Sequence, residues 1–218
     1  MNRVTTANGN VAVSGTTIDN IEVDATLKNI PAGIANSFVA DLAAEGAISG
    51  TVSAAGSLAA PTANFDLDWK DAATSHTKRA GLAALGLTAA GKFADNKLDF
   101  NAAASGAEGL SLKSTGNVAL VGTTVENIKV DAEIAKIPAS LANAFVPDLA
   151  AGGTISGTLS AAGTPAAPNA DFKLAWTDAA TSHTRSAHLS GLALAASGHF
   201  ADNRLDFDAD LGGKDGLS

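Results

Sequence analysis

The sequence predicts an all-β protein: an elongated repeat sheet with one short helix per repeat. Two observations lead to this fold class. Apolar and polar residues alternate strictly over several segments, and the same series of segments occurs twice. Equivalent residues lie 107 positions apart, as Trp69 and Trp176 do. We therefore expect a first copy in residues 1–111 and a second in residues 112–218, forming one continuous structure that is a fragment of a longer protein.

A short amphipathic helix is expected in the first third of each copy. In the first copy Ile34, Phe38 and Leu42 follow helical spacing. Pro31 suits the start of a helix, and Gly46 stands where a helix would stop. The second copy carries a proline inside the equivalent segment, so only about two helical turns are expected to be common to both copies.

Strands are expected wherever apolar and polar residues alternate, because successive side chains of a strand point to opposite faces. Asp95-Asn96 separates two such segments and predicts a tight hairpin turn. Each copy is expected to contain about six to eight strands. The alternating segments of the first copy are residues 21–28, 48–53, 63–70 and 85–93, and further strands are expected through Leu98 and Phe100 and through Leu110 and Leu112.

An antiparallel sheet with one apolar face must cover that face with a second sheet, with its own folded half or with a ligand. Two separate sandwiches would satisfy this requirement. However, no Pro-rich or charged linker separates the copies around residues 100–118, which favours one continuous, folded sheet. Small residues on the apolar stripes, such as Ala54, Ala89 and Ala102, leave volume that two facing sheets would need bulkier side chains to fill.

The apolar positions of both copies are candidates for lining a lipid groove. Acyl chains could occupy space that protein side chains leave empty, whereas an ordinary closed core is the other explanation for such stripes. The candidate lining residues are Ile21, Val23, Leu27, Ile48, Val52, Ala54, Phe65, Leu67, Trp69, Leu85, Leu87, Phe93, Leu98, Phe100, Ile128, Val130, Ile134, Ile155, Leu159, Ala161, Phe172, Leu174, Trp176, Leu192, Leu194, Phe200, Leu205 and Phe207.

Charge and composition argue against several functional classes. The 14 Lys and Arg residues are scattered singly among 22 acidic residues, giving a formal charge of −8, so nucleic acid is not an expected partner. Cysteine is absent, which excludes disulfides, thiolate catalysis and cysteine-ligated zinc. No apolar run approaches the roughly 18 residues of a membrane span, and the N-terminal residues lack the hydrophobic region of a signal peptide.

The polar residues form no recognisable catalytic or cofactor motif. His76 and His183 each follow Ala-Thr-Ser and are expected in turns, since zinc needs three or four converging ligands. Asp206, Asp208 and Asp210 are faintly similar to a calcium loop. The first copy does not keep these charges, which favours a solvated strand face. We expect no enzyme activity, no cofactor and no metal.

The longest passage shared by the copies resembles a known family. Residues 137–168 read Ile-Pro-Ala-Ser-Leu-Ala-Asn-Ala-Phe-Val-Pro-Asp-Leu-Ala-Ala, followed by Gly-Gly-Thr-Ile-Ser-Gly-Thr-Leu-Ser-Ala-Ala-Gly-Thr-Pro-Ala-Ala-Pro. This passage is similar to the repeats of the TamB translocation and assembly module proteins of the AsmA-like superfamily. The segment that begins at Trp176 resembles the segments between those repeats.

The resemblance implies a long periplasmic protein that is anchored in the inner membrane by a segment not present in this sequence. It implies a sheet folded lengthwise into a U-shaped, β-taco-like gutter with an apolar interior, and an outer-membrane barrel partner bound through other regions. The implied roles are the passage of phospholipid acyl chains between the membranes and the assembly of outer-membrane proteins. A structural or adhesive stalk of tandem β domains is the alternative, and it would close a dry core.

Overall fold

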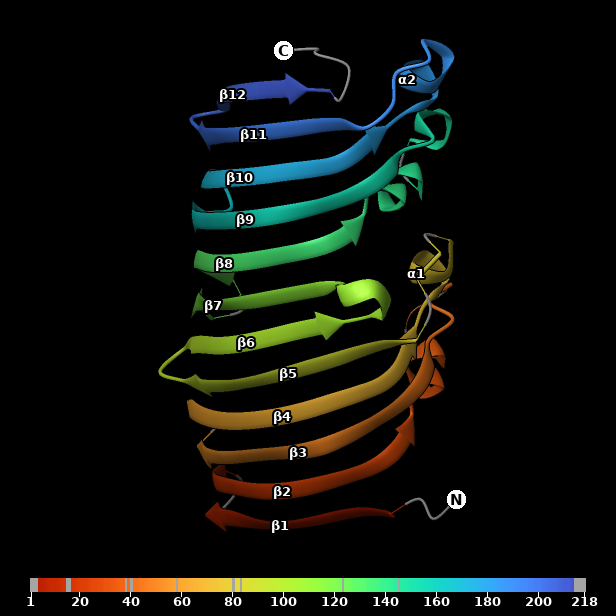
Figure 1. Ribbon diagram of the computed structural model, residues 1–218. Helices are drawn as coiled ribbons and strands as arrows, with labels where there is room; N and C mark the ends of the chain where they lie inside the picture. Colours follow the sequence, from red (N-terminus) through yellow and green to blue (C-terminus); the bar gives the residue numbers. More distant parts are fainter. Residues whose placement is uncertain are drawn as a thin grey trace.

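In the computed structural model the described residues include twelve strands, which form one antiparallel sheet in the order of the chain (Figure 1). The sheet is open, since β1 and β12 each pair with a single strand among the described residues. The prediction of an all-β fold is confirmed. The structure describes residues 4–14, 17–37, 39, 41–57, 59–79, 81–82, 84–122, 124–144 and 146–213.

Six strands come from each copy of the repeat. The strands of the first copy are β1 (Val4–Ser14), β2 (Thr17–Pro31), β3 (Glu45–Ser57), β4 (Ala60–Ala73), β5 (Leu85–Ala94) and β6 (Lys97–Ser105). The strands of the second copy are β7 (Ser111–Val121), β8 (Thr124–Pro138), β9 (Gly152–Thr164), β10 (Ala167–Ala180), β11 (Leu192–Ala201) and β12 (Arg204–Gly212).

The junction between the copies lies inside the sheet. Strands β6 and β7 pair without a register shift, from Lys97 opposite Ala119 to Ser105 opposite Ser111. The 3₁₀ turn η2 (Ala107–Gly109) joins the two strands. Hydrogen-bonded backbone therefore continues from the first copy into the second.

The predicted hairpin turn at Asp95-Asn96 is confirmed. It joins β5 to β6, and its two residues have φ angles of +50° and +57°. Asp202 and Asn203 make the same turn between β11 and β12, with φ angles of +51° and +57°. Two consecutive positive φ angles match the twist of the flanking strands, and Asp and Asn tolerate them better than other residues with a side chain.

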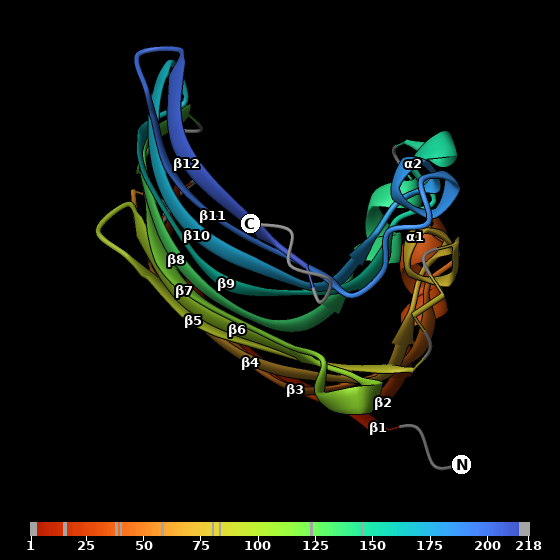
Figure 2. The ribbon, with the colours of Figure 1, turned by 45° about the horizontal axis from the view of Figure 1, so that its top comes forward.

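The sheet curves along its strands (Figure 2). A residue with positive φ lies within a register shift on four strands: Asn29 on β2 and Asp71 on β4, with their repeat equivalents Lys136 on β8 and Asp178 on β10. An extra residue in one strand of a pair bends that strand and increases its twist. Gly46 lies in β3 opposite such a shift, so the prediction that it ends a helix is wrong.

Short helical segments gather at one end of the strands (Figure 1). The prediction of a single amphipathic helix per copy is wrong, because each copy contains both 3₁₀ and α segments. Pro31 ends β2, and Pro147 begins a second 3₁₀ segment. Leu42 lies outside any helix, and Phe38 lies outside the described residues. The segments are η1 (Ala32–Ser37), α1 (Ser75–Arg79), η3 (Ala139–Ala144), η4 (Pro147–Leu149) and α2 (Ser182–Ser186).

A side-chain contact explains why the first helix stops early. The side-chain oxygen of Asn36 accepts a hydrogen bond of 2.7 Å from the backbone N–H of Ala44, and its amide nitrogen donates to the Ala44 carbonyl. This pair of bonds draws the chain that follows η1 back toward β3. A longer helix would carry the same residues away from Ala44.

Buried side chains are few and mostly small. Ala72, Leu85 and Leu110 form a cluster near the bend, with Trp69 and Leu87 packed against it. Among the described residues no large side chain is fully buried. The described sheet is therefore a single layer with a local core at its bend, and no second layer covers the middle of its strands.

Candidate functional site

Cross-strand pairing places every predicted lining residue on one face of the sheet. Val52 lies opposite Phe65, which lies opposite Gly91, and the other lining residues occupy positions that pair or alternate with these. We call this face the apolar face. The residues between them, such as Ser53 and Asp66, belong to the opposite, polar face.

The predicted lining residues differ in exposure along the sheet. Leu85 and Leu192, beside the helical end, are only 7% and 3% exposed. Leu205 and Phe207, on the last strand, are 51% and 63% exposed. The remaining lining residues are half-buried, apart from two that are exposed to 37% and 39%. Those two are Val23 and Leu159.

A hollow of about 340 Å³ opens on the apolar face across β3 to β7. It forms where the small side chains of Ala89, Ala102 and Ala104 stand among larger ones such as Trp69 and Leu112. Its volume falls within the range of about 300–1,000 Å³ that is typical of small-ligand pockets. The small residues that the sequence singled out therefore leave open space on this face.

Aromatic rings lie over glycines of the next strand. A Cβ atom on Gly91 would be 2.6 Å from Cζ of Phe65, and one on Gly198 would be 2.7 Å from Cζ of Phe172. The register places these glycines on the apolar face, and their lack of a side chain leaves room for the rings. The alternation predicted that Gly91 lies on this face, but only the strand register shows which phenylalanine faces which glycine.

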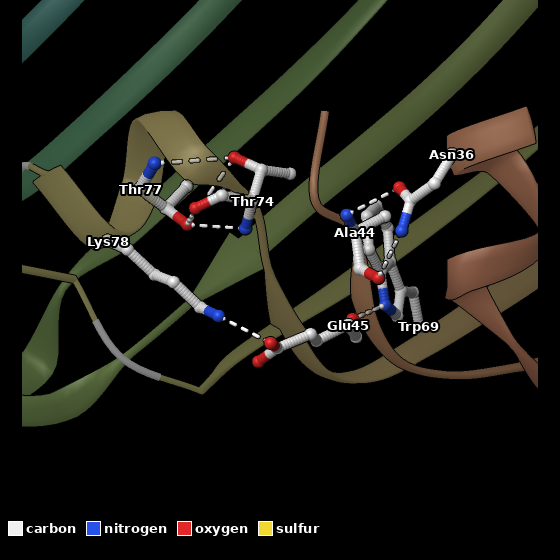
Figure 3. Close-up of polar contacts among 7 residues, drawn as sticks. All are labelled: Asn36, Ala44, Glu45, Trp69, Thr74, Thr77 and Lys78. Atoms are coloured by element: carbon white, nitrogen blue, oxygen red, sulfur yellow. Dashed lines mark hydrogen bonds and ion pairs between the residues drawn. The ribbon is translucent and has the colours of Figure 1, made fainter. Parts of the chain in front are cut away.

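Equivalent hydrogen bonds brace the helical end of both copies, and Figure 3 shows those of the first copy. In the first copy Trp69 Nε1 donates a bond of 2.8 Å to the carbonyl of Glu45, and Asn36 holds the backbone of Ala44. The second copy repeats the tryptophan bond at 2.8 Å, from Trp176 to the carbonyl of Gly152. Each indole is thereby fixed in orientation on the apolar face.

His76 and His183, predicted in turns, lie instead in the short helices α1 and α2. The physical reason is a reciprocal cap in which Thr74 and Thr77 bond each other's backbone N–H through their hydroxyl groups. Two otherwise unsatisfied donors are satisfied in this way, which stabilises a single helical turn. Lys78 of α1 also forms an ion pair of 2.5 Å with Glu45 of β3 (Figure 3).

The polar face has larger but charged hollows. One of them, of about 1,110 Å³, lies across β7 to β12. Its polar side chains pair with one another: Nδ1 of His199 lies 2.8 Å from a carboxylate oxygen of Asp171, and the Ser160 hydroxyl donates to Asp131. Such a surface suits water better than acyl chains, so we place the candidate site on the apolar face.

The aspartates compared with a calcium loop occupy alternate positions of the exposed strand β12. Asp206 accepts hydrogen bonds from the guanidinium of Arg204, at 2.6 and 2.9 Å. Within the ranges that the structure describes, no three His, Asp or Glu side chains converge in a way that would hold a metal ion.

Comparison of the chain with protein-family models, curated proteins and solved structures finds no match. The resemblance to TamB proteins therefore stays an expectation from the residues quoted above. In the described part of the chain, no helix is both long enough and apolar enough to cross a membrane.

Proposed function

We propose that this protein is a segment of a lipid-carrying gutter in a cell envelope. In this proposal the curved sheet is a U-shaped, β-taco-like gutter, and its apolar face is the interior along which phospholipid acyl chains pass between inner and outer membranes. The parent protein is TamB-like and periplasmic, and it also supports the assembly of outer-membrane proteins with a barrel partner. Its membrane anchor and its partner-binding region lie outside this segment.

The main support for this proposal is an apolar face that no second layer covers among the described residues. Large side chains such as Phe100, Leu112 and Ile134 remain half-buried in the middle of the sheet. A closed stalk domain would bury such residues between two layers. Extended apolar surface of this kind usually marks a site that binds an apolar ligand, a membrane or another protein.

Burial at the bend supports the apolar face as the inner side. Beside the Asp71 bulge, Ala72 is 1% exposed and Leu85 is 7% exposed, whereas Lys70 and Asp71 are exposed. Bending a sheet brings the side chains of its concave side together and spreads those of its convex side apart. The pattern of burial is that expected for an apolar interior.

The apolar rows continue across the junction between the copies. Leu87 lies opposite Ala104, which lies opposite Leu112, and Leu112 lies opposite Ile134 of the second copy. Burying a methylene group is worth about 0.8 kcal/mol and requires no directional bond. An acyl chain could therefore shift from one strand to the next along such a row without losing specific contacts.

Photo-crosslinking from neighbouring residues of β5 tests the proposal. A crosslinker at Leu87 on the apolar face should capture phospholipid in cells that make the full-length parent, whereas one at Thr88 on the polar face should not. Mass spectrometry of the crosslinked species identifies the lipid. Equal lipid yields at the two positions, or no lipid at either, would contradict the gutter and favour the stalk.

A further inference from the structure

The hollow on the apolar face continues as a row of small side chains that crosses the junction between the copies. The row begins next to Leu67 of β4 and ends next to Leu159 of β9, and each member lies opposite the next. Its members are Ala89 of β5, Ala102 of β6, Ser114 of β7 and Ala132 of β8. We call these four residues the floor. The hollow of about 340 Å³ opens over the floor from β5 to β7.

Larger side chains lie on both sides of the floor. On one side, Phe65 and Phe100 occupy the neighbouring row. Their rings fill the space above Gly91 and Gly116, so the glycines leave no gap in this side. The row on the other side contains one small residue, Ala104, among larger ones, which are Trp69, Leu87, Leu112 and Ile134. The floor and its two sides therefore form a trench that runs across the strands.

We propose that the trench holds one acyl chain of a phospholipid, which lies across the strands and along the length of the gutter. This inference rests on the proposed function and adds the direction and the number of the bound chains. In the trench the chain contacts the floor and both sides, and the benefit of burying hydrocarbon grows with the area that is buried. A chain laid along a strand would instead have to pass over the larger side chains on one side of the floor.

The length of the trench matches a single acyl chain. Neighbouring strands lie about 4.8 Å apart, so the floor spans about 14 Å and the leucines at its two ends are about 24 Å apart. The hydrocarbon of one bilayer leaflet is about 15 Å thick, half of a core of about 30 Å. A chain of ordinary membrane length therefore fits between Leu67 and Leu159.

Two phospholipid probes test the direction of the chain. Each carries one diazirine on an acyl chain, close to the ester in the first probe and close to the terminal methyl group in the second. The full-length protein is incubated with phosphatidylcholine vesicles that contain one of the probes and is then irradiated, and mass spectrometry identifies the labelled residues. We expect the two probes to label trench residues on different strands, such as Ala89 and Ala132.

The other outcomes separate the trench from the gutter. Labels of the two probes that are separated along one strand, for example at Leu87 and Phe93 of β5, would overturn the trench while the gutter stands. Labels of both probes spread over the whole apolar face would do the same. No label on the apolar face would overturn both proposals.

Filling the floor provides a second test. Ala89→Phe should lower labelling of the trench by more than about tenfold, as expected when two methylene groups of the lipid lose their contacts. Ala90→Phe is the matched control and should leave labelling unchanged, because Ala90 lies opposite Asp66 on the polar face. Ala89→Ser keeps the floor small and should be labelled as the unmodified protein is.

Circular dichroism checks that the three variants are folded. Equal labelling of the two phenylalanine variants would overturn the proposal. The probe experiment uses the unmodified protein, so its outcome does not depend on how the variants fold.

Discussion

The ring of Phe100 lies over Gly116 across the junction between the two copies, where a Cβ atom on the glycine would be 2.9 Å from the phenylalanine Cζ. The same relationship joins Phe65 to Gly91 and Phe172 to Gly198. These contacts join neighbouring strands on the apolar face, which no second layer covers within the described residues, and the effect of losing them can be measured.

Gly91→Val should destabilise the protein by about 1–3 kcal/mol, the usual cost of overpacking, because the new side chain meets the Phe65 ring and the backbone of β6. Urea unfolding measures the change. Gly212→Val is the matched control, since nothing lies within 4 Å of a Cβ atom there. Adding Phe65→Leu to Gly91→Val should recover part of the lost stability, because the smaller side chain makes room for the valine. If the double variant loses the sum of the two single losses in free energy of unfolding, the valine does not displace the ring.

Asn143→Ala should cost about 1–3 kcal/mol, because it leaves the backbone N–H of Ala151 without its partner. That N–H donates a bond of 2.7 Å to the Asn143 side chain, and Ala151 is only 5% exposed. The free energy of unfolding from urea titration is the readout. Asn169→Ala on an exposed stretch of β10 should change it by less than about 0.5 kcal/mol. If the two variants change the free energy of unfolding equally, the hydrogen bond between Asn143 and Ala151 does not stabilise this end of the sheet.

Asp71→Val should destabilise the protein by about 1–2 kcal/mol, because Asp71 has a φ of +52° that a β-branched residue adopts poorly. Asp71→Gly should be neutral or stabilising, since glycine reaches positive φ without strain. Thermal unfolding compares these variants with Asp68→Val, three residues earlier on the same strand at a position of ordinary φ. If Asp71→Val and Asp68→Val lower the melting temperature equally, the positive φ of Asp71 is not the cause of the destabilisation.

Ala54→Arg should leave the full-length parent folded and abundant but lower lipid crosslinking per folded molecule. On an open apolar face the guanidinium reaches water, whereas in a closed core an unpaired charge costs at least on the order of 3 kcal/mol. Ser53→Arg, the next residue of β3 and on the polar face, is the control and should change neither property. Loss of the folded protein in the Ala54 variant alone would indicate a closed core.

The strand faces were predictable because successive side chains of a strand point to opposite faces, whatever covers either face of the sheet. Residues such as Val52 and Phe65 share a face in the sequence pattern and in the register alike. The bulges were not predictable, since Asp71 and Lys136 take positive φ without being glycine. The spacing from Ile34 to Leu42 looked helical, but it could not reveal that Asn36 bonds the backbone of Ala44.

For the candidate site, the alternation showed which residues share the apolar face but not how they are covered. The glycines beneath the phenylalanine rings and the bonds of the tryptophan indoles require the register and the loop structure. Lipid binding at this face stays a prediction, and crosslinking from Leu87 and Thr88 is its most direct test.

Within the part of the chain that the structure describes, each strand pairs only with its neighbours in sequence, from β1 through to β12. Almost all pairing is therefore local in sequence, so the loops closed during folding are short and folding can start at any hairpin and spread in both directions. Stability in such a linear array is close to a sum of nearest-neighbour terms. A defect in one hairpin should consequently weaken hydrogen-exchange protection there and in the adjoining strands, while distant strands keep theirs.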